Sequence, residues 1–185
     1  VQDTLAKQLV YWQNQLSDIK PLKLPFDHQP DGKVSYLGET LEFQFDDELS
    51  QQLKSLAAQN NTTLFAVVLS GYYSMLSYLC DQDDIVIGTP VSTRSKQALE
   101  ELVGLFLNTI MLRVVVDRTT SFSNLLQQVR DKTLEALNYI DLPSEDVVSK
   151  LGKPRPNGQA SLYQARFVYR DNQRDSIELD VLKIS

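Results

Sequence analysis

The sequence predicts an α/β fold in two layers, a mixed β-sheet with helices mainly on one of its faces. Segments with the apolar spacing of amphipathic helices alternate along the chain with shorter apolar runs that are typical of strands. The sequence contains no repeat of about 20 to 50 residues, which argues against solenoid and propeller folds. Its 185 residues are close to the length of one domain and are enough to bury a core.

Three helices are predicted in the first half of the chain, at about 4–16, 47–59 and 63–80. Each carries apolar residues three or four positions apart, the spacing that places them on one helical face. Thr62 and Thr63 offer an N-cap to the third helix, because a threonine hydroxyl can accept a hydrogen bond from the first turn. This helix is apolar on most sides, so we expect it to be buried.

The interval between the first two helices is predicted to hold a linker and a strand. An extended linker or loop is predicted over 18–33, because this stretch contains three prolines and a glycine. A strand is predicted over 36–45, where Leu41, Phe43 and Phe45 alternate with polar residues.

The second half of the chain contains two strong predicted strands, at 84–89 and 106–116, and a helix at 121–138 that begins after Ser121. The remaining predicted elements are a loop or short helix at 92–102, loops at 139–143 and 153–160, a short helix at 144–151, and closing strands at about 162–170 and 176–184.

Composition and charge exclude several classes of function. A net charge of −6 and a pI near 4.8 argue against non-specific binding to nucleic acid, which requires a basic surface. The sequence has no apolar stretch of about 18 residues and no signal-peptide pattern, so we expect a cytoplasmic protein without a membrane partner. Cys80 is the only cysteine, so no disulfide can form within the chain. A start at Val1 rather than at Met suggests an excised piece of a longer protein.

The sequence does not contain the residues of the common catalytic and metal sites. Its only histidine, His28, has no second ligand at metal spacing, so we predict no metal site. No glycine-rich loop resembles a phosphate cradle, and a serine triad is impossible without a histidine partner.

Two segments in the middle of the chain carry a recognisable pattern. DIVIGTP at 84–90 is a buried-strand run that ends in a turn, and VGLFLNTIMLR follows at 103–113. The pair resembles the middle of a condensation domain of nonribosomal peptide synthetases, where the pattern is roughly DIVVGTPVANR followed by IGFFVNTLVLR.

The resemblance extends along nearly the whole chain, with the family's segments in their usual order. Three further stretches are similar to the YWxxxL helix, the LPxD linker without its following Arg, and the TLF helix start: YWQNQL at 11–16, LPFD at 24–27 and TTLF at 62–65.

Two later segments depart from the family pattern. YIDLPSE at 139–145 resembles the HQDLPFE motif, with Tyr139, Ile140 and Ser144 in place of His, Gln and Phe. The segment from Arg155 to Gln164 resembles the RDxSRxPLFQ motif only weakly.

The resemblance implies one lobe of the chloramphenicol acetyltransferase-like fold. The family's catalytic motif is HHxxxDG, which belongs to the N-terminal lobe, and His28 has no histidine neighbour. We therefore expect residues 1–185 to be the C-terminal, acceptor-side lobe, truncated at both ends. No catalytic residue is expected in this chain, which would be inactive on its own.

The implied reaction is the formation of an amide in nonribosomal peptide, antibiotic or other secondary-metabolite biosynthesis. A carrier-bound acyl or peptidyl thioester is transferred to the amine of an acceptor aminoacyl carrier protein, and this lobe completes the tunnel and positions the acceptor. No cofactor is expected to bind directly, because a partner carrier domain delivers the phosphopantetheine arm. The implied partners are the N-terminal lobe, peptidyl and aminoacyl carrier proteins, and an adjacent adenylation domain, with no nucleic acid.

Six residues at matching positions are candidates for the substrate tunnel: Thr89, Asn108, Thr109, Arg113, Asp141 and Glu145. Thr89 belongs to a turn that either lies near the acceptor side of the tunnel or simply ends a strand. Asn108 and Thr109 point to opposite faces of a strand, so either one of them lines the tunnel or both form hydrogen bonds within the sheet.

The other three candidates also have two interpretations each. Arg113 either pairs with a buried acid or the missing lobe, or is a surface residue at the end of a strand. Asp141 either orients backbone amides near the tunnel or is architectural, and Glu145 either completes a helix cap or is architectural.

Two other functions fit the same residues. The weak match at 155–164 also fits a lobe of an epimerisation or ester-forming relative. The missing histidines fit a non-catalytic module that binds carrier proteins. An HHxxxDG motif upstream of the chain would indicate an enzyme, and its lack would indicate such a module.

Overall fold

The computed structural model describes residues 2–28, 37–94, 102–151 and 162–170, together with the backbone of 178–179 and 182–183. The expected loop at 153–160, Arg155, and parts of the expected segments at 18–33 and 92–102 lie outside the described residues.

Among the described residues, five helices lie close to the ranges predicted for them. They are α1 (Gln2–Gln15), α2 (Asp47–Gln59), α3 (Leu64–Cys80), α4 (Phe122–Leu137) and α5 (Ser144–Lys150). Side-chain caps begin three of these helices, where Asp46, Thr63 and Ser121 accept hydrogen bonds from the backbone amides of Leu49, Ala66 and Asn124.

The main sheet has three strands in the order β2-β1-β3. β1 (Asp84–Ser92) pairs antiparallel with β2 (Leu107–Val115) and parallel with β3 (Ala165–Arg166), so the sheet is mixed, as predicted. β4 (Glu178–Leu179) and β5 (Leu182–Lys183) form a separate antiparallel pair. The single strand predicted over 176–184 is therefore wrong, and the strand predicted over 162–170 is confirmed only at 165–166.

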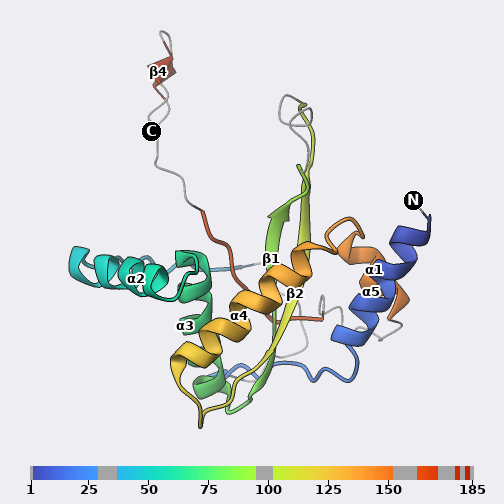
Figure 1. Ribbon diagram of the computed structural model, residues 1–185. Helices are drawn as coiled ribbons and strands as arrows, with labels where there is room; N and C mark the ends of the chain where they lie inside the picture. The colour runs from blue at the N-terminus through green and yellow to red at the C-terminus, as the bar shows by residue number, and fades with distance from the viewer. Residues whose placement is uncertain are drawn as a thin grey trace.

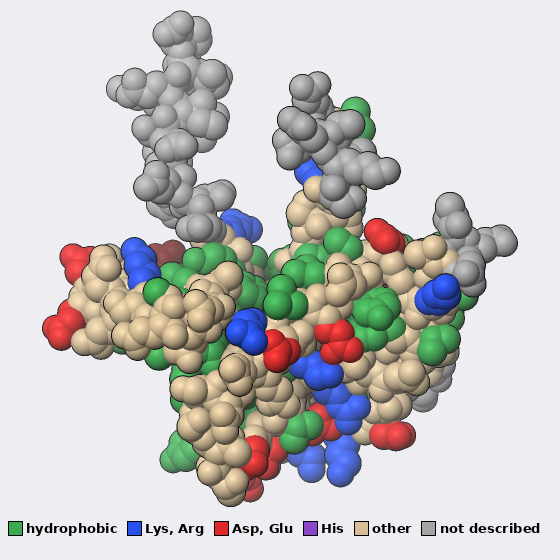
Figure 2. Space-filling view, in the orientation of Figure 1, with side chains coloured by type: hydrophobic (Ala, Val, Ile, Leu, Met, Phe, Trp, Pro, Cys, Tyr) green, Lys and Arg blue, Asp and Glu red, His purple; other side chains and the backbone are tan. Residues whose placement is uncertain are grey.

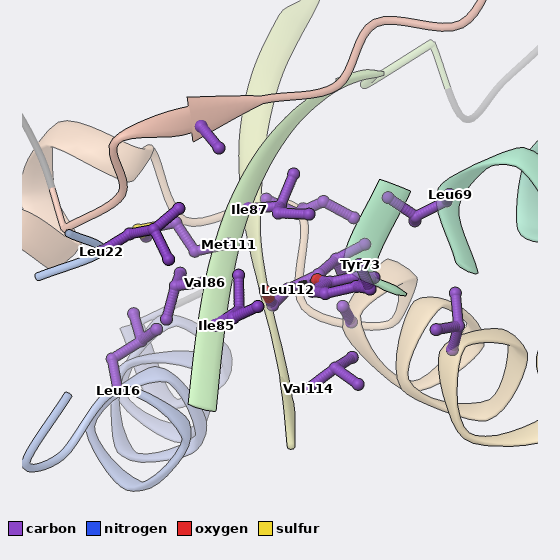
Figure 3. Packing of buried hydrophobic residues seen from close by; sticks show 14 of the residues in the cluster. Leu16, Leu22, Leu69, Tyr73, Ile85, Val86, Ile87, Met111, Leu112 and Val114 are labelled. Atoms are coloured by element: carbon purple, nitrogen blue, oxygen red, sulfur yellow. Dashed lines mark hydrogen bonds between the residues drawn. The ribbon is translucent and has the colours of Figure 1, made fainter. Parts of the chain in front are cut away.

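The core lies on both faces of the sheet, because neighbouring strand residues point in opposite directions. Ile85 and Ile87 face α3 and α4, and the Tyr73 hydroxyl of α3 donates to the Leu112 carbonyl at 2.8 Å. Figure 3 shows Val86 and Met111 on the other side of β1, beside Leu16 and Leu22, which follow α1. Helices α3 and α4 thus cover one face, with α2 packed against α3, while the C-terminal end of α1 reaches the opposite face (Figure 1).

The predicted strand at 36–45 is wrong. Residues 37–46 form neither helix nor strand, and Leu41 and Phe43 are 88% and 77% exposed. No other strand among the described residues lies beside this segment to accept its backbone hydrogen bonds. Alternation in the sequence predicts which residues would share a face, but it does not supply the neighbouring strand that a sheet requires.

The prediction that α3 is buried holds for one side of the helix. Ala66, Leu69 and Tyr73 are buried, whereas Tyr78 and Leu79 are exposed. Within the described ranges, no single helix is both long enough and apolar enough to cross a membrane.

Candidate functional site

The antiparallel pairing of β1 and β2 brings the two recognisable motifs side by side. Gly88 lies opposite Met111, and Pro90 lies opposite Thr109. The Gly-Thr-Pro segment of one strand and the Asn-Thr segment of the other therefore meet at the same end of the sheet. Figure 1 shows the β1–β2 hairpin continuing from this end, beyond the helices.

Asn108 uses its whole side-chain amide within the chain. Its Nδ2 donates to the carbonyls of Ile140 and Leu142 at 2.7 and 2.8 Å. Its Oδ1 accepts from the backbone amides of Thr109 and Ser144 at 2.8 and 3.1 Å. Asn108 therefore ties β2 to the loop that leads into α5, which leaves no polar atom of its side chain free for a substrate.

Gln8 ties α1 to the same loop. It is almost fully buried, its Nε2 donates to the Asp141 carboxylate at 2.9 Å, and its Oε1 accepts from the Leu142 amide at 2.9 Å. Gln8 was not among the candidate residues, although it lies on the apolar face of the predicted helix, four positions before Trp12. A polar residue at such a position is the signal that identifies a buried hydrogen-bonding side chain.

Asp141, in this loop, and Glu145, just after it in α5, are both exposed. Among the described residues, the Asp141 carboxylate accepts a hydrogen bond from the Gln8 side chain and from no backbone amide. Glu145 lies in the first turn of α5, where Pro143 occupies the N-cap without a side-chain hydrogen bond. Of the two interpretations of Glu145, the helix cap is not formed, because a proline N-cap has neither a side-chain acceptor nor a backbone N–H.

Arg113 pairs with an acid of the same chain. Its Nε and Nη2 donate to the two carboxylate oxygens of Asp84 at 2.8 and 2.7 Å. Its Nη1 donates to the carbonyls of Gln15 and Ser17 at 3.1 and 2.7 Å, so the same guanidinium holds the end of α1 against the sheet. The hydrogen bonds to Asp84 raise the pKa of Arg113 above its usual value, so the guanidinium stays charged.

Thr89 lies against a cavity of about 650 Å³, between the start of α3, the end of α4 and the end of β1. The lining side chains are mostly apolar; they include Leu64, Phe65, Val91, Ile110, Leu134 and Leu137. Figure 2 shows hydrophobic side chains gathered on this face, between α3 and α4. Thr89 is the only one of the six candidates among the described lining residues.

The polar groups of this cavity are few. The Thr62 hydroxyl oxygen is buried, and in the part of the chain that the structure describes it has no hydrogen-bond partner. Arg130 is the only charged residue among the described lining residues, and it pairs with its neighbour Asp131 at 2.9 Å. A buried hydroxyl without a partner costs free energy, and because its oxygen is closed to solvent it adds no polar group to the cavity surface.

Tyr139, which stands where the HQDLPFE motif has its histidine, is used for packing. Tyr139 stacks on Tyr11 with ring centroids 3.8 Å apart, and its carbonyl accepts from Trp12 Nε1 at 3.0 Å. Burial raises the pKa of the Tyr11 phenol, and the negative charge of Glu135 raises it further. The phenol therefore stays protonated at neutral pH and cannot serve as a general base there.

The remaining candidates for proton transfer or metal binding do not form a site. His28 lies in the exposed linker. Among the described residues, no group of three or more His, Cys, Asp and Glu side chains is placed to hold a metal ion. The described residues thus form an apolar cavity next to a sheet that side-chain hydrogen bonds connect to α1 and to the loop before α5. They do not form an acid–base pair.

Sequence comparisons find a family match and similar proteins along nearly the whole chain. A family profile described as "Condensation domain" matches residues 1–184. Malpinin synthetase of Mortierella alpina is 36% identical over 184 residues, which are 99% of this chain and 2% of that protein. Tyrocidine synthase 2 of Brevibacillus parabrevis is 34% identical over 181 residues, which are 97% of this chain and 5% of that protein. The chain thus spans a small part of these relatives.

Solved structures show the same fold. A four-domain nonribosomal peptide synthetase bound to AMP and glycine superposes with a TM-score of 0.85 at 26% identity, over 91% of this chain and 13% of that one. The X-domain from teicoplanin biosynthesis superposes with a TM-score of 0.82 at 22% identity, over 88% of this chain and 36% of that one.

Proposed function

Because the chain belongs to the condensation-domain family of nonribosomal peptide synthetases, we propose that it is part of an enzyme that joins two carrier-bound substrates through an amide bond. Residues 1–185 act as the C-terminal, acceptor-side lobe of the domain. The lobe completes a tunnel whose other wall comes from the N-terminal lobe, and it positions the acceptor aminoacyl group.

The observation that carries this proposal is the apolar cavity beside Thr89. It opens at the end of the strand that holds the Gly-Thr-Pro motif, and its volume of about 650 Å³ suits a small-molecule ligand. A positioned acceptor reacts faster because its amine is already held at the correct distance and angle.

The proposed reaction forms a C–N bond and breaks a C–S bond. The acceptor amine attacks the thioester carbonyl, the carrier thiol leaves, and the amine loses a proton to a base. His28 is exposed in the linker, and the Tyr11 phenol is kept protonated. The base is therefore assigned to the HHxxxDG motif in the rest of the domain, so this chain alone is inactive.

The remaining site residues take supporting roles. Asn108, Arg113 and Asp141 are positioning residues, because their side chains tie β2, α1 and the loop before α5 together. Thr109 and Glu145 are proposed to contact the incoming arm, because neither side chain is fully buried. The chain binds no cofactor itself; peptidyl and aminoacyl carrier domains deliver phosphopantetheine arms, and an adenylation domain loads them.

A reconstituted assay tests this function. The complete condensation domain is mixed with a loaded donor carrier and a loaded acceptor carrier, and mass spectrometry of the acceptor arm measures the joined product. The complete domain is expected to form the amide, and the 185-residue chain alone is expected to form none. In the complete domain, Thr133→Trp fills the cavity from α4 and is expected to slow the reaction roughly tenfold to a hundredfold.

Gln127→Trp is the matched control, because Gln127 is exposed on the same helix and does not line the cavity. Amide formation by the chain alone would contradict the assignment of the base. Equal rates for both tryptophan variants would contradict the positioning role.

Product only from a hydroxyacyl acceptor would indicate an ester-forming relative, and inversion of the α-carbon without joining would indicate an epimerising one. Carrier binding without any product would indicate a non-catalytic module.

A further inference from the structure

We propose that the cavity beside Thr89 binds the side chain of the acceptor amino acid and selects apolar side chains, with Leu134 as a specificity-determining residue. This inference rests on the proposed function and names the substrate class that the cavity takes. It follows from the size of the cavity, from the polarity of its lining, and from the place of Leu134.

Size alone gives this cavity little power to discriminate. Its volume of about 650 Å³ lies well inside the range of roughly 300–1,000 Å³ that is usual for drug-sized ligands. A single amino-acid side chain, an aromatic one included, therefore enters without a steric clash. Selection among side chains has to come from their polarity.

The lining favours apolar side chains over charged ones. Ile110 and Thr89 form a buried floor, each about 1% exposed, and the leucines of α4 form a wall. The one charged residue among the described lining residues is Arg130, which already pairs with Asp131. The ammonium group of a lysyl acceptor would lose its water beside the positively charged guanidinium and would find no carboxylate to pair with. Binding of lysine-like side chains is therefore the least favourable.

The Thr62 hydroxyl adds no accessible polar contact. Its oxygen is buried, without a hydrogen-bond partner among the described residues, so an acceptor group in the cavity does not reach it. A charged acceptor side chain would therefore lose its water without gaining a hydrogen bond from this residue.

Leu134 stands where a ligand would cover it. It lines the cavity from α4 and is nevertheless 58% exposed, and Leu137, one turn further along, is 40% exposed. Exposed leucines at the rim of an apolar cavity gain burial when an apolar group enters. They gain nothing from a charged group that keeps its water.

The experiment measures acceptor choice in the complete condensation domain. Acceptor carriers are loaded with leucine, phenylalanine, glutamate or lysine from the corresponding aminoacyl-coenzyme A, so that adenylation specificity does not enter. Single-turnover rates of amide formation are compared at equal carrier concentration. The unchanged domain is expected to use leucyl and phenylalanyl acceptors at least about tenfold faster than the lysyl acceptor.

Two variants at one position then move the preference in opposite directions. Leu134→Glu places a carboxylate at the rim and is expected to raise the lysyl-to-leucyl ratio about tenfold. Leu134→Lys is expected to raise the glutamyl-to-leucyl ratio instead, and lysine suits the last turn of a helix. Phe122→Glu is the matched control, because Phe122 lies at the start of the same helix, is 39% exposed, and does not line the cavity.

The two levels of the proposal fail differently. If the unchanged domain joins no acceptor at all, the proposed function is wrong. If it joins all four acceptors equally well, or if the ratios of both Leu134 variants equal those of Phe122→Glu, amide formation stands and the side-chain site is overturned. Each Leu134 variant predicts its own change in the acceptor ratio. If one variant misfolds, the other still decides the result.

Discussion

At the scale of single residues, buried and half-buried polar side chains connect elements of the fold. Asn108 makes four hydrogen bonds to the chain around it, three of them to residues 32 to 36 positions away. Gln8 makes two more to the same loop across more than 130 positions. These amides fix where the loop before α5 meets the sheet, because their polar atoms are used in contacts within the chain.

Asn108→Ala is expected to lower the free energy of unfolding of the condensation domain by about 2 kcal/mol. The change leaves two carbonyls and two backbone amides without their partner, and each half-buried group that stays unpaired is costly. Urea unfolding followed by circular dichroism measures the effect. Asn138→Ala is the control, because Asn138 is exposed and its side chain makes one local bond, so it should cost less than about 0.5 kcal/mol. Equal costs for the two variants would show that the Asn108 bonds are replaced by water.

At the scale of elements, the parallel pairing of β1 with β3 requires a glycine. The Tyr163 ring lies directly over Gly88, where an added Cβ would come within 2.5 Å of its carbon atoms. Ile87 pairs with Ala165, and the Phe167 amide donates to the Gly88 carbonyl at 2.9 Å. Gly88 therefore allows the chain near β3 to approach the sheet closely.

Gly88→Ala is expected to destabilise the domain by about 1–3 kcal/mol, because the Tyr163 ring has to move away from the sheet. Gly71→Ala is the matched control. Gly71 lies inside α3 with nothing within 4 Å of an added Cβ, so alanine should stabilise by up to about 1 kcal/mol. Thermal unfolding compares the variants. The Gly88 cost should shrink in a Tyr163→Ala background, and an unchanged cost there would contradict the steric cause.

The sequence predicts the helices well because their signals are local. The apolar spacing of α2 and α4 and the caps at Thr63 and Ser121 all lie within the elements that they define. The strand predicted over 36–45 is wrong because its alternation is local, whereas the partner strand that it needs is not. The extent of β3 likewise depends on its neighbour β1.

The candidate site was predictable only in part, for the same reason. The motif resemblance selected Thr89, but the cavity against it is built from α3 and α4, about 25 residues before and 45 residues after it. That Arg113 contacts Asp84 and the end of α1 depends on tertiary packing between segments almost 100 positions apart. Which side chains converge, and which are used up in holding the fold, follows from the three-dimensional arrangement alone.

At the scale of the whole molecule, two of the described segments leave large apolar side chains mostly exposed. One is the stretch 37–45, with Leu41 and Phe43. The other is the distal part of the β1–β2 hairpin, where Val103 and Leu105 are almost fully exposed. Several large exposed apolar side chains within one segment indicate an interaction site. On the proposed function, both segments face the rest of the condensation domain.

The 185-residue chain by itself is therefore expected to associate with itself in solution. Buried apolar area drives association, and two copies can cover each other's exposed segments when the rest of the domain is missing. Light scattering after size exclusion, over a range of concentrations, should show a mass above that of one chain. Phe43→Glu combined with Val103→Glu should shift the chain toward the monomer, because each change puts a charge into the exposed surface. Tyr78→Glu changes an equally exposed aromatic residue on α3, outside both segments, and should leave association unchanged. A monodisperse monomer at high concentration would mean that these segments need no partner.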